Sequence, residues 1–198
     1  MGGKRALAGA AAAVVLAVLV VVLLAAATEE HPARSPGGAV APAGSHARFT
    51  FLASRSSNQC GLQAAAIPRR GRLQGSCCSA MVEHAYREQV RGLRVYREVA
   101  QTPRDPYDIP ATLAKRLLRY DRTIRLSGAQ HRAYARAMAM SDQKGPCCCP
   151  CWRWNAFRGL SKFLIAERRW RPRRLATLID LLEGCGGPGH HHPQAATA

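Results

Sequence analysis

Four cysteines lie within a six-residue segment, and their types and spacing are the clearest sign of chemistry in the chain. The segment reads Pro146-Cys147-Cys148-Cys149-Pro150-Cys151. A disulfide needs Cα atoms about 5.5 Å apart and converging Cβ vectors, which neighbours in sequence rarely provide. Because these cysteines cannot all pair with one another, we expect their thiolates to bind a soft metal ion.

Several combinations of cysteines could supply the metal ligands. Cys147, Cys149 and Cys151 alternate through a loop bounded by prolines, so a bend could bring three sulfurs together, while Cys148-x-x-Cys151 has a two-ligand spacing. Further ligands or disulfide partners are expected from the cysteines that flank the other predicted helices. The predicted metal ligands are Cys147, Cys148, Cys149, Cys151, Cys77, Cys78 and Cys185.

The expected metal is copper(I), with zinc as the alternative. The cysteine segment precedes a predicted helix, whose unpaired N–H groups stabilise an anion and lower the pKa of a thiol. Zinc requires four ligands, whereas copper(I) accepts two or three, and methionine sulfur could assist it. The sequence disfavours a c-type haem, because Trp152 follows Cys148-x-x-Cys151 where haem attachment needs histidine. The nearby methionines are Met81, Met138 and Met140.

Two other uses of the eight cysteines stay open. An even number of cysteines in an oxidising compartment is typical of a disulfide-stapled domain, for example with Cys60 joined to Cys77 or Cys78. Alternatively, Cys148 or Cys149 attacks a disulfide and Cys151 resolves it, which would be thiol-disulfide exchange. The sequence contains no Ser-His-Asp set, paired carboxylates or phosphate loop in a supporting context, so we expect a binding protein rather than an enzyme.

The N-terminus predicts a membrane anchor. Residues 6–27 form an apolar run of Ala, Val, Leu and one Gly, long enough for a helix to cross a hydrocarbon layer of about 30 Å. Lys4 and Arg5 precede the run and acidic residues follow it, which favours a cytoplasmic N-terminus and an extracytoplasmic body. The alternative is a cleaved signal peptide with Ala25-Ala26-Ala27 near its cleavage site, which would yield a secreted protein.

The chain is strongly basic, with a formal net charge of +17. Eight basic residues lie between Arg153 and Arg174, against Glu167 as the one acidic residue. Outside the cytoplasm, anionic lipid headgroups are the expected counter-surface for this charge. Nucleic acid is not expected as a partner, because aromatic residues are few and no binding motif is present. The sequence indicates no particular protein partner.

The apolar pattern predicts helices that position the cysteines. An amphipathic helix is expected over about 79–101, a second from Pro110, a third from a capping box at Ser127 and Gln130, and a fourth directly after the cysteine segment. Pro172 would open a fifth, which Gly184 would close in a left-handed conformation. The predicted fold class is all-α, a small helical bundle of four to five helices behind a single N-terminal transmembrane helix.

The expected layout has four parts. Residues 1–30 are the anchor or signal, 31–48 a flexible linker rich in Pro, Gly, Ala and Ser, 49–188 the cysteine-rich helical domain, and 189–198 a disordered tail. Phe49–Leu52 is expected to be a short strand or a docking segment, and 54–74 a loop.

The cysteine segment resembles the signature of a bacterial family of secreted lipoproteins named for its P-C-Y-C-G-C motif. Pro146, Cys147, Cys149 and Cys151 match that motif, whereas Cys148 and Pro150 depart from it, and the chain lacks a lipobox. More broadly, five blocks are similar to those of an uncharacterised membrane-anchored, cysteine-rich bacterial family. Both resemblances imply a metal-binding role. Neither family has an activity that could be carried over to this chain. The blocks are residues 75–78 (GSCC), 105–108 (DPYD), 145–149 (GPCCC), 151–154 (CWRW) and 184–187 (GCGG).

Overall fold

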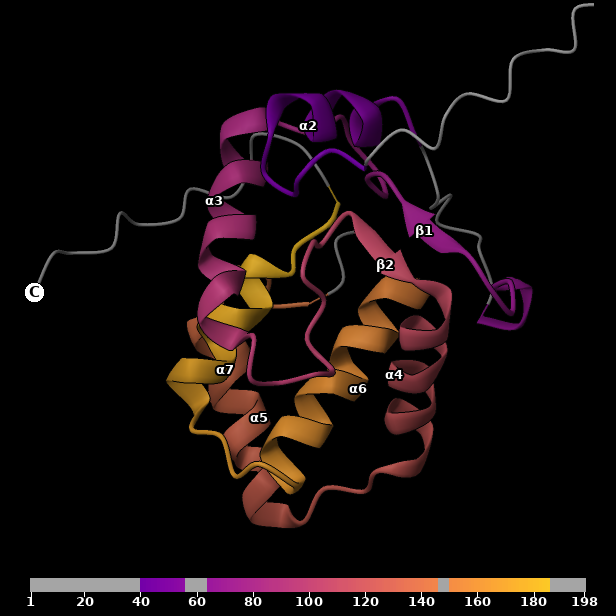
Figure 1. Ribbon diagram of the computed structural model, residues 1–198. Helices are drawn as coiled ribbons and strands as arrows, with labels where there is room; N and C mark the ends of the chain where they lie inside the picture. Colours follow the sequence, from indigo (N-terminus) through magenta and orange to yellow (C-terminus); the bar gives the residue numbers. More distant parts are fainter. Residues whose placement is uncertain (1–39, 56–63, 146–149, 186–198) are drawn as a thin grey trace, which may run out of the picture. The chain divides into compact units, whose positions relative to one another are not determined.

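The computed structural model describes residues 40–55, 64–145 and 150–185 (Figure 1). The chain divides into two units, 1–40 and 41–198, and every element named below belongs to the second. The predicted anchor, most of the predicted linker and the C-terminal tail lie outside the described residues. Among the described residues, no helix has the length and apolar character needed to span a bilayer.

The described residues are mostly helical, as the apolar periodicity predicts, but they contain six α-helices where the sequence predicted four to five (Figure 1). Two short 3₁₀ turns, Ala64–Ala66 and Arg94–Tyr96, and two three-residue strands, β1 (Arg72–Gln74) and β2 (Asp108–Pro110), accompany the helices. The helices are α2 (His46–Ala53), α3 (Glu83–Leu93), α4 (Ala111–Thr123), α5 (Gly128–Met140), α6 (Trp152–Ala166) and α7 (Pro172–Leu181).

The starts of the later helices follow the local signals in the sequence. The capping box before α5 is present, because the Ser127 side chain accepts from the Gln130 backbone N–H while the Gln130 side chain accepts from the Ser127 N–H. Pro172 occupies the first turn of α7, where its missing N–H costs no helical hydrogen bond. Pro110 is the N-cap residue of α4 rather than part of its first turn.

Helix α3 is shorter than predicted. It begins at Glu83 instead of near residue 79 and ends at Leu93, after which the chain tightens into the 3₁₀ turn. Residues 79–82 are not helical, and Val82 is extended; the segment before them is held by backbone bonds to residues 184 and 185, described below.

Helices α4 and α6 pack along one another and form the centre of the main core. Gly159 of α6 makes their close approach possible, because a Cβ at this position would overlap the backbone carbonyl of Leu117 in α4. Trp152, Leu160 and Leu164 of α6 are buried in this core. The first turn of α6 is therefore fixed in the protein interior.

Two parts of the chain differ from the sequence prediction. Phe49–Leu52 is not a strand but lies within the helix α2, whose N-cap Ser45 accepts from the Arg48 N–H. The predicted loop 54–74 ends in β1, which pairs antiparallel with β2 so that Leu73 faces Ile109. The pairing partner lies beyond α3 in the sequence, so a local pattern of three residues could not indicate it.

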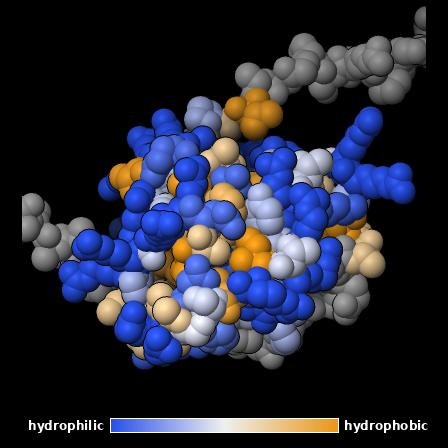
Figure 2. Space-filling model, turned by 90° about the horizontal axis from the view of Figure 1, so that it is seen from below, coloured by the Kyte–Doolittle hydropathy of each residue, from blue (hydrophilic) through white to orange (hydrophobic). Residues whose placement is uncertain are grey.

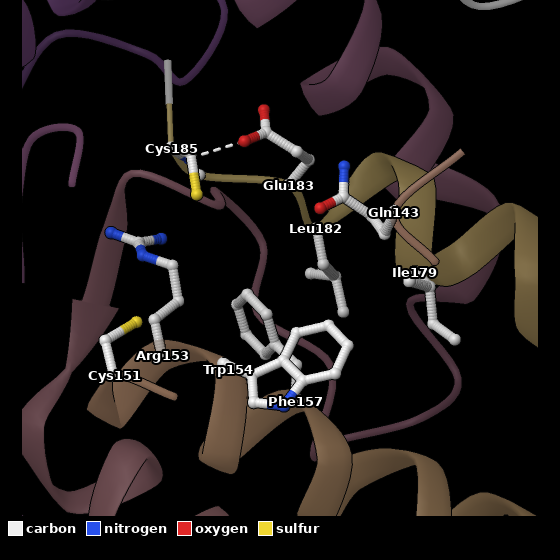
Figure 3. Close-up of a pocket in the computed structure, with 10 residues that line it drawn as sticks. Gln143, Cys151, Arg153, Trp154, Phe157, Ile179, Leu182, Glu183 and Cys185 are labelled. Atoms are coloured by element: carbon white, nitrogen blue, oxygen red, sulfur yellow. Dashed lines mark hydrogen bonds between the residues drawn. The ribbon is translucent and has the colours of Figure 1, made fainter. Parts of the chain in front are cut away.

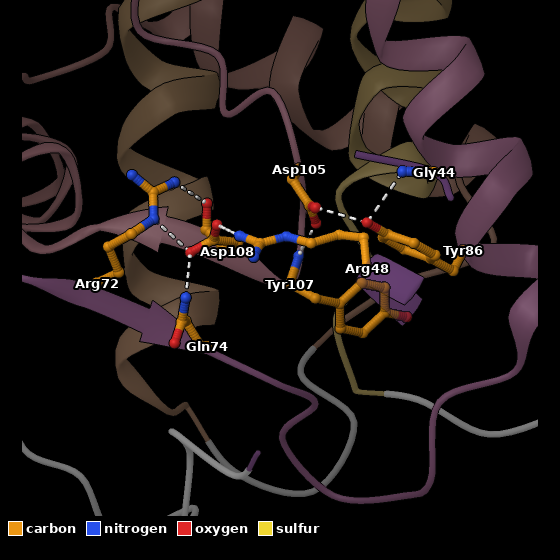
Figure 4. Close-up of polar contacts among 8 residues, drawn as sticks. All are labelled: Gly44, Arg48, Arg72, Gln74, Tyr86, Asp105, Tyr107 and Asp108. Carbon is orange, nitrogen blue, oxygen red and sulfur yellow. Dashed lines mark hydrogen bonds and ion pairs between the residues drawn. The ribbon is translucent and has the colours of Figure 1, made fainter. Parts of the chain in front are cut away.

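A buried polar network attaches α2 to the rest of the domain (Figure 4). The Arg48 guanidinium forms a buried ion pair with Asp108, whose carboxylate also accepts from Arg72 Nε at 2.5 Å and from Gln74 Nε2 at 3.2 Å. Beside it, Tyr86 donates to Asp105 at 2.8 Å and accepts from the Gly44 N–H at 3.1 Å. These contacts hold α2 against β2 and α3.

Candidate functional site

Cys151 lies at the start of α6, as the sequence predicts. It is the N-cap residue of that helix and is buried, with 7% of its surface exposed. The backbone N–H groups of Trp154 and Arg153 stabilise its thiolate. In this position the unpaired N–H groups of the first helical turn lower the pKa of the thiol. The turn itself is fixed, because α6 packs in the main core.

A second cysteine-bearing segment runs beside the C-terminal end of the described chain. Cys77 N–H donates to the Gly184 carbonyl at 2.9 Å, and the N–H groups of Cys78 and Ser79 both donate to the Cys185 carbonyl, at 3.0 and 2.8 Å. Cys77 is half-buried and Cys78 is exposed. Three segments that are distant in the sequence therefore meet where α6 begins.

The two segments place the sulfurs of Cys77 and Cys151 within hydrogen-bonding distance. This hydrogen bond is the main reason why the pKa of Cys151 falls to about 6, against the opposing effect of burial, and the nearby N–H groups and the Arg153 charge add to it. The same hydrogen bond, followed by burial and the adjacent negative charge, raises the pKa of Cys77 above its ordinary range. The pair is therefore one thiol that donates to one thiolate at neutral pH.

Arg153 ties the surrounding segments together (Figure 3). Only 3% of its surface is exposed. Its Nη1 donates to the Pro106 carbonyl and its Nη2 to the Gly75 carbonyl at 3.1 Å. The guanidinium thus positions the 75–78 and 105–108 segments around the first turn of α6 and supplies a positive charge near the thiolate.

Gly184 has a different role from the predicted one. Its φ is not positive, so it is no left-handed cap, and the C-cap residue of α7 is Leu182. A Cβ at position 184 would instead overlap the Arg153 guanidinium. Glycine is required there because the backbone passes directly over a buried side chain.

The segment before Cys77 is fixed by a second glycine. Gly75 has φ +91°, and a Cβ there would overlap the backbone carbonyl of Arg55 at the end of α2. Its N–H donates to the Tyr107 carbonyl at 2.9 Å. Gly75 thus packs against Arg55, just beyond the end of α2. The polar network that holds α2 therefore also helps to position the segment that carries Cys77.

A small apolar cavity adjoins the cysteines (Figure 3). Its volume is about 40 Å³, and its walls include Trp154, Phe157 and Leu182, with Cys151 and Cys185 at one end. A space of this size admits a water molecule or a small group rather than an organic cofactor.

The structure brings some of the predicted metal ligands together, and others fall outside the residues that it describes. Cys77 and Cys151 contact one another, and Cys78 and Cys185 lie on the segments that hold them. Cys147, Cys148 and Cys149 fall outside the described residues. Within residues 40–55, 64–145 and 150–185, no group of three or more His, Cys, Asp or Glu side chains is arranged to hold a metal ion. Met81 packs in the hydrophobic cluster of α2 and α3, and Met140 is exposed on α5.

The basic stretch 153–174 does not form one charged face of α6. Arg153 is buried, Arg158 and Lys162 bind Asp121 of α4, and Arg174 pairs with Glu98. The exposed basic residues of this stretch lie in the connection between α6 and α7 and in the first turn of α7: Arg168, Arg169, Arg171, Arg173 and Arg174.

The sequence placed Cys77 and Cys151 in one predicted ligand set without singling out this pair, and the structure brings the two together. The close approach of Gly184 to Arg153 was not predicted. No protein-family model, curated protein or solved structure matches the chain. The resemblance to cysteine-rich bacterial families therefore stays a prediction.

Proposed function

We propose that this protein binds a soft metal ion, copper(I) in preference to zinc, at the start of α6, with Cys77 and Cys151 as its first two ligands. The observation that carries the proposal is the contact between their two sulfurs, which are contributed by distant segments and held by backbone bonds. Sulfur donors select soft ions such as copper(I) over harder ones.

The donor set favours copper(I). Zinc needs four ligands in a tetrahedron, whereas two thiolates are sufficient for copper(I). Cys151 already exists largely as a thiolate at neutral pH, so only Cys77 must lose its proton when a metal binds. A bound copper(I) ion would supply a positive charge that stabilises both thiolates. Arg153 and the first turn of α6 orient Cys151 for this role.

Further ligands would come from cysteines that border the pair. Cys78 follows Cys77 directly, and Cys185 accepts backbone bonds from the same segment. Cys147, Cys148 and Cys149 remain candidates because they immediately precede Cys151 in the sequence. A four-cysteine set drawn from these residues would shift the preference toward zinc.

The proposal includes the expected cellular setting. We infer a single-pass membrane protein whose N-terminal helix anchors the helical domain outside the cytoplasm, with secretion after signal cleavage as the alternative. A tethered thiolate site suits storage, sensing or delivery of a metal ion rather than catalysis. Four of the blocks that resemble a cysteine-rich bacterial family meet at Arg153, which supports a shared role for them: 75–78, 105–108, 151–154 and 184–187.

The same contact favours a second candidate function, reversible disulfide formation between Cys77 and Cys151. The Cys151 thiolate would attack an external disulfide, break its S–S bond and release one thiolate, and Cys77 would then attack Cys151, forming their bond and releasing the second. The external disulfide is reduced by two electrons, and its two leaving sulfurs take one proton from Cys77 and one from solvent. A permanent bond of this kind would make the domain a disulfide-stapled structural module. The low pKa of Cys151 suits it to attack such a disulfide.

One experiment separates these functions. The full chain is purified in detergent without oxygen, its thiols are counted, and its metals are measured by elemental analysis. Metal binding predicts reduced thiols with bound copper that is lost in Cys77→Ala and kept in the control Cys60→Ala. Disulfide chemistry predicts a Cys77–Cys151 crosslink in peptide mass spectrometry and no metal. Copper that stays bound in the Cys77→Ala variant would contradict the proposed site.

A further inference from the structure

A second cavity lies on a different part of the domain, between the connection from α4 to α5, helix α5 and helix α6. Its volume is about 410 Å³, and Ile124, Leu126 and Tyr134 contribute its apolar walls. None of the cysteines lines it. Small-molecule sites typically have volumes of roughly 300–1,000 Å³, so this cavity is large enough for an organic ligand.

The polar lining of this cavity is basic. Arg125, Arg158 and Lys162 contribute three positive charges, and His131 adds an imidazole. Asp121, which is 8% exposed, forms ion pairs with Arg158 and Lys162, and the described ion pairs include none to Arg125 or His131. Three positively charged side chains therefore line the cavity, and one carboxylate forms ion pairs with them among the described residues. Two of the three positive charges are left unbalanced by these ion pairs.

Asp121 holds two of the cationic side chains in fixed positions. Arg158 forms a bidentate pair with it through Nε at 2.7 Å and Nη2 at 2.6 Å. Lys162 Nζ donates to the Asp121 carbonyl at 2.5 Å and lies 2.9 Å from its carboxylate. Because this pairing restricts both side chains before any ligand arrives, binding would cost little side-chain entropy.

The pairing leaves donors for a ligand. Nη1 of Arg158 takes no part in the bidentate pair, and the Lys162 ammonium has one proton beyond its two bonds to Asp121. Burial raises the pKa of Tyr134, which keeps its hydroxyl protonated as a further donor. Donors of this kind match the oxygens of an anion.

We propose that this cavity binds a phosphate group attached to an apolar moiety. A phosphate carries up to two negative charges and several acceptor oxygens, which match two unbalanced cations and several free donors. A bare phosphate would fill only part of the volume, whereas the walls at Ile124, Leu126 and Tyr134 suit an aromatic or acyl group. A soluble phosphate ester and a phospholipid headgroup share this chemistry.

The surface on this side of the molecule agrees with an amphipathic ligand. Figure 2 views the domain from the side on which α5 begins and α6 ends in Figure 1, and it shows apolar side chains within a surround of hydrophilic ones. A ligand that carries both an anion and an apolar group could contact both kinds of surface at once.

The test uses the full chain in an uncharged detergent and calorimetric titration with three probes: inorganic phosphate, phenyl phosphate and short-chain phosphatidylglycerol. Saturable binding of either of the last two, tighter than that of inorganic phosphate, is expected. The probe that binds identifies a soluble ester or a lipid as the source. Arg125→Glu should weaken this binding by about tenfold, equivalent to about 1.4 kcal/mol.

Three further variants make the test specific. Tyr134→Phe removes one donor and should also weaken binding, whereas Arg91→Glu, an exposed change on α3, should leave it unchanged. Cys77→Ala should leave it unchanged too, so the result does not depend on the proposed metal site. The inference is overturned if no probe binds saturably, or if Arg91→Glu weakens binding as much as Arg125→Glu does. Far-ultraviolet circular dichroism checks that each variant is folded.

Discussion

The guanidinium of Arg153 lies directly against the backbone of Gly184, in the space that a Cβ at position 184 would occupy. The Gly184 carbonyl also accepts the N–H of Cys77, while Arg153 binds the Gly75 carbonyl on the same segment. This arrangement connects the end of the described chain, the Cys77 segment and the first turn of α6. The positions of both sulfurs therefore depend on one buried arginine.

Gly184→Ala should destabilise the protein, because the new methyl group would displace Arg153 from its bonds to Pro106 and Gly75. Overpacking of this kind costs about 1–3 kcal/mol. Urea unfolding of both proteins measures the difference. The matched control is Gly128→Ala at the start of α5, where the nearest atom is 3.7 Å away and no loss of stability is expected. Equal stabilities of the Gly184 and Gly128 variants would contradict this role of Gly184.

Cys77→Ala should raise the pKa of Cys151 from about 6 toward its ordinary value of 9.0, because the hydrogen bond from Cys77 is the largest cause of the depression. The ultraviolet absorbance of the thiolate, followed against pH, measures this shift. At pH 7 the thiolate fraction of Cys151 should therefore fall in the variant.

Cys78→Ala is the control for this titration. The side chain of Cys78 hydrogen-bonds with Cys77, but it is not among the main causes of the low Cys151 pKa. The pKa of Cys151 should stay near 6 in this variant. A Cys151 pKa that stays equally low in the Cys77 variant would show that the helix start alone lowers it.

Asp121→Asn should destabilise the protein at neutral pH and much less in acid. Burial raises the pKa of Asp121, but the hydrogen bonds from Arg158 and Lys162 outweigh it, so the folded-state pKa lies below 3.8. The stabilisation is therefore present above the unfolded-state value and is lost as the pH falls through the folded-state value. At pH 7 the substitution should cost about 1–3 kcal/mol.

Denaturant unfolding at neutral and acidic pH measures this dependence. Asp142→Asn is the control, since Asp142 is exposed and its carboxylate makes none of the described ion pairs. A loss of stability for Asp121→Asn that does not change with pH would argue against the ion pair as its cause.

Tyr86→Phe should loosen the attachment of α2. The hydroxyl of Tyr86 donates to Asp105 and accepts from Gly44, so its removal leaves two polar groups without this partner. The expected cost is about 1–3 kcal/mol, and limited proteolysis should cleave α2 faster. Tyr120→Phe is the control, because Tyr120 stacks on Phe163 without a described hydroxyl bond. Unchanged proteolysis of the Tyr86 variant would show that other contacts suffice to hold α2.

Much of the helical arrangement could be predicted from local sequence. The capping box at Ser127, the proline at position 172 and the apolar periodicity of α4 and α6 are signals within a few residues of one another. The helical nature of α2 was missed, because Phe49 and Phe51 alternate as in a strand and the ion pair that holds the helix joins Arg48 to the distant Asp108.

The candidate site was predicted only in part. The position of Cys151 at a helix start follows from the sequence immediately after it, and so do the backbone N–H groups that help to stabilise its thiolate. The choice of Cys77 as its neighbour depends on backbone bonds to Gly184 and Cys185, which no local pattern indicates. Charge counting in 153–174 also did not show that Asp121 in another helix pairs with two of those residues.

The most direct test of the account is a copper(I) titration of the reduced full chain against a coloured copper(I) chelator, without oxygen. The account predicts that the protein withdraws copper(I) from the chelator and that both Cys77→Ala and Cys151→Ala weaken this binding, whereas Cys60→Ala does not. Copper binding that is unchanged in the Cys77 and Cys151 variants, or no withdrawal of copper by the reduced protein, would contradict the account.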